Sequence, residues 1–213
     1  MGLTTMIPTG LPAFVLASTL IELTPGPNMA WLAMVAATEG RRPGFAAVGG
    51  VALGLGVIGV AAAFGLAAII AATPALYQAL RWAGVLYLLW LAWDGWRDGG
   101  AEDGNTHAGI TLRRAFRRGL VTNLLNPKAA LFYIAVLPGF TDPGASVLVE
   151  TLILTAAYVA VATAIHAGIV VLAGSAHALL DDPVRSRLVR RALSAALALV
   201  AIWFAWSSRT GGA

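Results

Sequence analysis

The sequence lacks cysteine, has few charged residues and contains no lysine or arginine before Arg41. Without cysteine the chain has no disulfide framework, no thiolate nucleophile and no thiolate metal ligand. Only 11% of its residues are charged and 59% are hydrophobic, whereas an ordinary soluble domain has roughly 25% charged residues. This composition predicts an all-α integral membrane protein.

Further absences narrow the function. A cleavable signal peptide would begin with a basic region, so the first apolar segment is expected to stay in the mature protein. The sequence has no H-E-x-x-H, G-x-S-x-G or phosphate-loop motif, and its apolar segments hold no paired carboxylates, so a membrane-embedded enzyme is disfavoured. No cofactor and no metal site are expected.

Two features imitate nucleotide or nucleic-acid binding. Gly54-Leu-Gly56-Val-Ile-Gly59 matches a dinucleotide-binding fingerprint, but it lies within continuous apolar sequence and position 79 is alanine instead of an acid. The pI of about 10.1 comes from basic residues in short tracts between apolar segments. Such charges set membrane topology, so no nucleic-acid partner is expected.

Apolar segments of membrane-spanning length occur six times, at about 20 residues per span. They are Pro12–Thr38, Phe45–Ala72, Ala75–Trp96, Gly119–Leu137, Val147–His177 and Leu188–Ser207. Eleven of the fourteen lysines and arginines fall in or beside the first, third and fifth connections. The positive-inside rule then predicts cytoplasmic odd connections and both termini outside. Arg81, inside the third segment, is expected to snorkel to the interface.

The polar, glycine-rich stretch beginning at Asp98 divides the chain into two halves. We expect a first three-span repeat at 1–97, a flexible cytoplasmic linker at 98–112 and a second three-span repeat at 113–213. Because each half has an odd number of spans, the second would enter the membrane in the opposite sense from the first. The predicted fold is therefore six transmembrane helices arranged as two inverted three-helix repeats.

The first and fourth segments contain corresponding helix breakers. The first carries Thr24-Pro25-Gly26-Pro27-Asn28, and the fourth carries Asn123-Leu-Leu-Asn126-Pro127-Lys128. Proline cannot continue a helix, and Thr-Pro or Asn-Pro is the pattern of a helix N-cap followed by its first residue. Broken helices in inverted halves are typical of secondary transporters, with the substrate bound where the breaks meet.

Three ionisable residues lie inside the apolar segments, namely Glu22, Lys128 and His166. Lys128 falls in the first turn of a predicted half-helix, where a bound carboxylate would offset the unfavourable helix dipole. Alternatively, Lys128 forms an ion pair with Glu22 that only holds the halves together. Glu22 could accept a substrate ammonium group or carry a proton, and His166 is a second proton-relay candidate or a structural histidine.

These residues together resemble the lysine-exporter/RhtB (LysE-type) family of bacterial amino-acid exporters. The resemblance rests on the Thr24–Asn28 motif, the turn at 39–44, the glycine-rich run Gly50–Gly54 and Asn126-Pro127-Lys128. It implies a multi-pass bacterial inner (plasma) membrane efflux protein that is driven by the proton gradient and often forms a homo-oligomer. Many members carry an acidic residue where this sequence has Leu55, which places more weight on Glu22.

We therefore expect a secondary transporter that exports amino acids or related zwitterions through the lipid bilayer. The substrate carboxylate would lie at Lys128 and its ammonium near Glu22, Asn28, Asn123 and Asn126. Trp31, Phe132 and Tyr133 are candidates for the pocket wall. The alternatives are a metal or inorganic-ion exporter, for which one carboxylate is a poor cage, and a non-transporting membrane scaffold subunit.

Overall fold

The computed structural model describes residues 8–98, 110–141, 146–177 and 183–207, and within them all regular structure is helical. The elements in order are α1 (Leu11–Leu23), α2 (Pro27–Glu39), α3 (Arg41–Ala63), α4 (Leu66–Ala72), α5 (Pro74–Asp98), α6 (Leu112–Leu124), α7 (Pro127–Leu131), a π-helical turn η2 (Phe132–Val136), a 3₁₀ turn η3 (Leu137–Phe140), α8 (Val147–His177) and α9 (Pro183–Ser207). The prediction of an all-α chain is confirmed for these residues.

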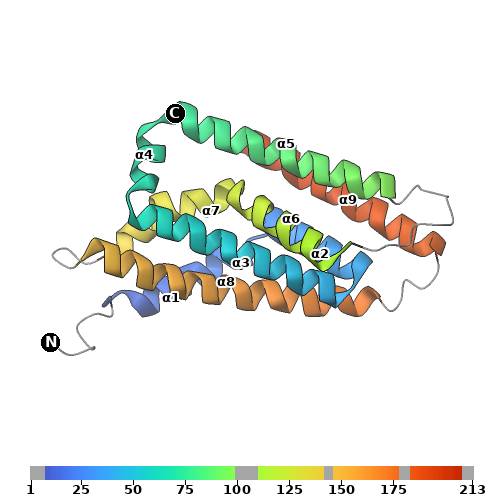
Figure 1. Ribbon diagram of the computed structural model, residues 1–213, viewed down its shortest axis with the longest axis horizontal. Helices are drawn as coiled ribbons and strands as arrows, with labels where there is room; N and C mark the ends of the chain where they lie inside the picture. The colour runs from blue at the N-terminus through green and yellow to red at the C-terminus, as the bar shows by residue number, and fades with distance from the viewer. Residues whose placement is uncertain (1–7, 99–109, 142–145, 178–182, 208–213) are drawn as a thin grey trace.

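Helix α3 is central to the packing. It lies against α6 on one side and α8 on another, while α2 contacts both α8 and α9. Helices α5 and α9 lie side by side along one edge of the molecule, with the short α4 connecting α3 to α5 (Figure 1). The α5–α9 pair therefore joins the rest of the structure mainly through α2.

Small residues let α3 and α6 approach closely, as the glycine-rich run predicts. A Cβ added at Gly50 would lie 2.0 Å from the carbonyl oxygen of Phe116. A Cβ added at Gly119 would lie 2.2 Å from the carbonyl oxygen of Ala47. Each helix thus places a glycine against the backbone of the other. The same face of α3 carries Gly54, which positions α6 near the functional site.

Replacing Gly50 with alanine is expected to lower the free energy of unfolding by about 1–3 kcal/mol, because the new methyl group meets backbone that cannot move aside. The melting temperature of the purified protein should fall accordingly. Gly56→Ala on the same helix is the matched control, since a Cβ there meets nothing within 4 Å. Thermal melts in detergent compare the two variants. Equal melting temperatures would contradict the close α3–α6 contact.

Fewer than six helices are both long enough and apolar enough to be identified as membrane-spanning among the described residues. Among the described residues, α3 and the part of α8 from Val147 to Ser175 are long and apolar enough to cross a membrane, with mean hydropathies of 2.2 and 2.0. The pair Leu112–Leu124 and Pro127–Phe140 also qualifies if its two parts, bent by 47°, form one span. The six-span inverted arrangement therefore remains a prediction.

The other expected spans differ from uninterrupted apolar helices in identifiable ways. The first is divided into α1 and α2, each of 13 residues. The second ends early, because Gly65 adopts a left-handed conformation (φ 89°) that separates α3 from α4. Helices α5 and α9 each have 25 residues, about 38 Å at 1.5 Å per residue. Most of the expected linker, residues 99–109, lies outside the described residues.

Arg81, expected to snorkel to the interface, instead has its side chain buried within the protein. Only 3% of the surface of Arg81 is exposed. Its guanidinium donates to the carbonyl oxygen of Ala205 and to the side-chain oxygen of Gln78. It also lies 5.3 Å from the centre of the Trp82 ring. The end of α9 therefore covers Arg81 and supplies the acceptor that water would otherwise provide.

Candidate functional site

The break in the first segment lies between α1 and α2. Helix α1 ends at Leu23, and Thr24 follows in an extended conformation with its hydroxyl donating to the carbonyl of Leu20. Helix α2 begins at Pro27, with Gly26 as its N-cap. The predicted role of Thr24 as an N-cap is therefore wrong. Thr24 caps the end of α1, and the second proline, not the first, is the first helical residue.

The break in the fourth segment follows the predicted pattern. Asn126 is the N-cap of α7, and its side-chain oxygen accepts a hydrogen bond from the backbone N–H of Lys128 at 3.0 Å. Pro127 is the first residue of the helix. Lys128 therefore lies in the first turn of α7, as the sequence predicts. The Asn126 side-chain oxygen is therefore already engaged in capping α7.

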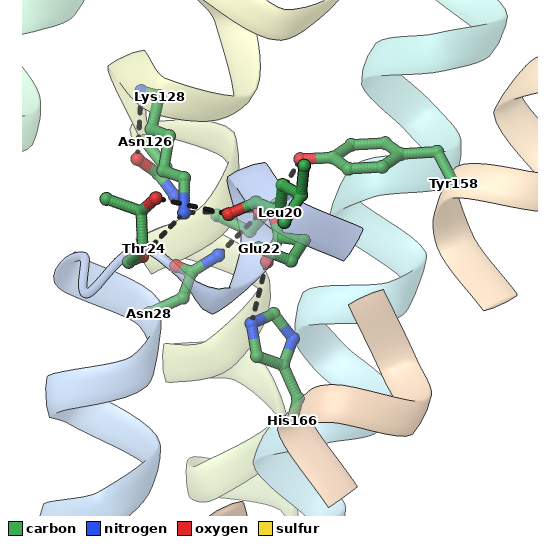
Figure 2. A network of polar contacts seen from close by, with 9 residues as sticks. Leu20, Glu22, Thr24, Asn28, Asn126, Lys128, Tyr158 and His166 are labelled. Carbon is green, nitrogen blue, oxygen red and sulfur yellow. Dashed lines mark hydrogen bonds and ion pairs between the residues drawn. The ribbon is translucent and has the colours of Figure 1, made fainter. Parts of the chain in front are cut away.

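The two breaks meet at Lys128. Its ammonium group donates to the backbone carbonyl of Thr24 at 2.9 Å, across 104 residues of sequence (Figure 2). A Cβ added at Gly26 would lie 3.4 Å from Cδ of Lys128. The end of α1 thus supplies a backbone acceptor for the cation on α7. Such a freed carbonyl needs a partner when no water is available, and Lys128 provides it.

Glu22, in the last turn of α1, is the acidic centre of the site. The residue is 5% exposed. Its carboxylate accepts a hydrogen bond from the Tyr158 hydroxyl at 2.6 Å and lies 3.3 Å from Nε2 of His166 (Figure 2). Its distance to Nζ of Lys128 is 4.0 Å, longer than a hydrogen bond. Glu22 is therefore closest to two groups that can hold or release a proton.

Tyr158 was not among the site residues predicted from the sequence. A tyrosine in the middle of a long apolar helix, two turns before His166 on the same helix, was the available signal. Its ring stacks on Phe132, with centroids 3.7 Å apart and planes at 12°. This stacking fixes the direction of the hydroxyl toward Glu22. Tyr158 therefore belongs to the site by geometry.

Two asparagines form a second polar contact beside the breaks. Asn28 in α2 donates from Nδ2 to Oδ1 of Asn123 in α6, at 2.8 Å. Asn123 is also held by α3, because a Cβ at Gly54 would lie 2.8 Å from its Nδ2. Within the described chain, Oδ1 of Asn28 and Nδ2 of Asn123 are buried without a hydrogen-bond partner. One acceptor and one donor thus remain available at the interface between the predicted halves.

A recess of about 210 Å³ lies at the breaks. It is lined by Ile21, Thr24, Pro25, Gly26, Pro27, Lys128 and Trp203. The proposed wall residues Trp31, Phe132 and Tyr133 do not line it and are at most 2% exposed. Trp203 of α9, which was not among the predicted wall residues, lines the recess instead.

The predicted site residues fall into two groups. Thr24, Pro25, Gly26, Pro27 and Lys128 line the recess. Glu22, Asn28, Asn123 and Asn126 are buried around it, and His166 is 1% exposed behind Glu22. In the part of the chain that the structure describes, no three His, Asp or Glu side chains converge as metal ligands would. The geometry thus joins one cation, one carboxylate and several amide or backbone dipoles.

These observations describe a helical membrane protein with a charged site at two helix breaks. A family model described as LysE type translocator matches residues 19–208. The chain is 32% identical over 189 residues to a homoserine/homoserine lactone efflux protein of Salmonella typhimurium, covering 88% of this chain and 92% of the relative. It is 36% identical over 138 residues to a leucine efflux protein of Enterobacter sp. (strain 638), covering 62% of this chain and 64% of the relative.

The chain belongs to the LysE type translocator family. The resemblance stated from the sequence motifs is confirmed. Since this is a family of membrane amino-acid efflux transporters, the expectation that the protein is not an enzyme is also confirmed. No solved structure matches the chain.

Proposed function

We propose that this protein exports small zwitterionic amino acids or their close derivatives across the bacterial inner membrane, driven by the proton gradient. The observation that carries the proposal is the placement of Lys128. Its ammonium lies in the first turn of α7, at the break between α1 and α2, and lines the recess. A cation at the positive end of a helix dipole is unfavourable unless an anion joins it.

A substrate carboxylate would satisfy Lys128 and the helix N-termini together. Lys128 now donates to the Thr24 carbonyl. When a carboxylate draws the ammonium of Lys128 toward itself, the Thr24 carbonyl becomes free to accept the substrate's own ammonium. The buried Asn28 Oδ1, which has no partner among the described residues, is a second acceptor near this point. The substrate thereby replaces contacts that the empty site makes internally.

Glu22 is assigned to proton transfer in this proposal. It does not line the recess, and its nearest partners are the Tyr158 hydroxyl and the His166 imidazole. These three groups can exchange a proton without large movement, because a hydroxyl and an imidazole both donate and accept. The 4.0 Å separation between Glu22 and Lys128 couples the two functions electrostatically. Protonation of Glu22 would remove a negative charge beside the substrate carboxylate.

The proposal includes the predicted architecture. Two inverted three-span repeats, 1–97 and 113–213, would rock against each other around the breaks, with the linker in the cytoplasm and both termini outside. The contacts from Lys128 to Thr24 and from Asn28 to Asn123 both cross between these halves. Movement of one half against the other would therefore open or close contacts at the substrate. Such alternating access at a midplane site is typical of secondary transporters.

Export of a labelled panel from proteoliposomes tests the proposal directly. The panel contains homoserine, homoserine lactone and leucine, because similar chains are named as their efflux proteins. It also contains a dipeptide and a divalent metal ion as negative substrates. We expect export of at least one small amino acid that stops when an uncoupler removes the proton gradient.

Transport of the metal alone would favour the inorganic-ion exporter. Absence of transport of every compound would favour the scaffold subunit. Amino-acid export that is unchanged by the uncoupler would retain the substrate site and reject the assignment of Glu22 to proton coupling.

A further inference from the structure

A second, larger cleft lies away from the helix breaks. It has a volume of about 530 Å³ and runs between α5 and the first three turns of α6. Its α5 side presents Tyr87 and Trp90, and its α6 side presents four arginines, Arg113, Arg114, Arg117 and Arg118. A cleft with four guanidinium groups is a site for an anion with several oxygen atoms.

The spacing of the arginines explains why they share one face. They occupy positions i, i+1, i+4 and i+5 of a helix, within an arc of about 140° at 100° per residue. The opposite side of α6 carries Ala115 and Gly119, which are buried against α3. The close contact between α3 and α6 therefore fixes the direction in which the arginines point. They face α5 and the cleft.

The positive charge in the cleft is only partly balanced. Asp94 of α5 pairs with Arg118 and lies 3.6 Å from Arg114. Among residues 8–98, 110–141, 146–177 and 183–207, neither Arg113 nor Arg117 lies within 4.0 Å of a carboxylate. In the described part of the chain, one carboxylate thus faces four guanidinium groups. The positive charge of Arg113 and Arg117 would be stabilised by an anionic partner.

Exposed tryptophans in and beside the cleft are of the kind found at a membrane surface. Trp90 and Trp93 of α5 are 47% and 61% exposed, and the Arg118 guanidinium lies 5.0 Å from the centre of the Trp90 ring. Tryptophans concentrate where lipid head groups meet the hydrocarbon region. The cleft therefore combines aromatic side chains of α5, which suit acyl chains, with arginines of α6, which suit a phosphate.

We propose that this cleft binds the phosphate head group of an anionic glycerophospholipid. Arg113 and Arg117 supply the unbalanced charge, and Tyr87 and Trp90 contact the glycerol and the upper acyl chains. Bound lipid would fill the space between α5 and α6, two helices that make few contacts with each other. The inference is independent of the proposed export function, because none of these residues lines the recess at Lys128.

Native mass spectrometry of the full chain tests the proposal. Protein purified with equal amounts of phosphatidylglycerol and zwitterionic phosphatidylethanolamine is expected to retain phosphatidylglycerol preferentially. R113Q/R117Q is expected to weaken this retention at least tenfold, since each basic residue near an anionic lipid contributes about 1 kcal/mol. R42Q/R185Q, which removes two exposed arginines elsewhere, is the matched control and should keep the wild-type preference.

Three outcomes would overturn the proposal. Equal loss in both double variants would indicate general attraction to a charged surface. Equal binding of inorganic phosphate and lipid would indicate a simple anion site. A preference that appears only in E102Q/D103N would indicate that the acidic connection between α5 and α6 occupies the cleft itself. Thermal melts of each variant in phosphatidylethanolamine alone confirm that all of them fold.

Discussion

Replacing Lys128 with alanine is expected to reduce the export of free amino acids by at least about thirtyfold. The substitution leaves the substrate carboxylate without its cation at the helix break, and loss of one member of a buried, hydrogen-bonded charge pair costs about 2–5 kcal/mol. Initial rates of export from proteoliposomes measure the effect. Lys128→Arg retains the charge and should retain part of the activity.

A comparison of two substrates separates carboxylate recognition from a structural role. Homoserine has a carboxylate, whereas its lactone keeps the ammonium but has lost that negative charge. If Lys128 binds the carboxylate, K128A should impair homoserine export more than lactone export. If Lys128 only holds α7 against α1, K128A should reduce the export of both substrates by the same factor, and its melting temperature should fall. That second result would support the Glu22–Lys128 pair as a purely structural contact.

Replacing Glu22 with glutamine is expected to abolish transport driven by a pH gradient while leaving substrate binding nearly intact. Glutamine keeps the shape of the side chain but cannot exchange a proton with Tyr158 or His166, which lie 2.6 and 3.3 Å from the Glu22 carboxylate. We expect at least a hundredfold loss of gradient-driven export, since among the described residues no second carboxylate pairs with Lys128 or His166 to replace it. Binding is measured separately from transport.

The composition of the chain makes the binding measurement simple. Lys128 is the only lysine in the sequence, so amine-directed labelling followed by peptide mass spectrometry reports on this position alone. A bound substrate should protect Lys128 in both wild type and E22Q. Glu150→Gln is the matched control, because Glu150 is also 5% exposed but lies in the first turn of α8, 16 residues before His166. Loss of protection in E22Q would place Glu22 in substrate binding instead of proton transfer.

The two helix breaks show how far local sequence can predict structure. Asn126-Pro127 forms the N-cap and first residue of α7 because an asparagine oxygen and a proline satisfy requirements that are local to one turn. Thr24-Pro25 has the same pattern but lies two residues before the N-cap and first residue of α2, Gly26 and Pro27. The presence of Pro27 two residues later allowed either start. Packing against α7 and the contact to Lys128 accompany the later one.

The contacts between site residues that lie far apart in the sequence could not be predicted from any local pattern. Glu22 could be recognised as a costly intramembrane charge, yet its hydrogen bond with Tyr158 joins residues 136 positions apart. Trp203 lines the recess, although its sequence context resembles an ordinary interfacial aromatic. In both cases the deciding factor is which helices pack together. Sequence periodicity identifies a buried face but does not identify what covers it.

The sequence by itself determined the class of the protein, the family, the positions of both breaks and the charges beside them. These depend on composition, on proline and glycine, and on the cost of charge in an apolar segment, all of which are local properties. The tertiary structure decided that Lys128 contacts the end of α1, that Glu22 faces Tyr158 and His166, and that four arginines line one cleft. Those choices follow from the close glycine contacts of α3 with α6 and from the placement of α8, because only packed helices bring such distant side chains within bonding distance.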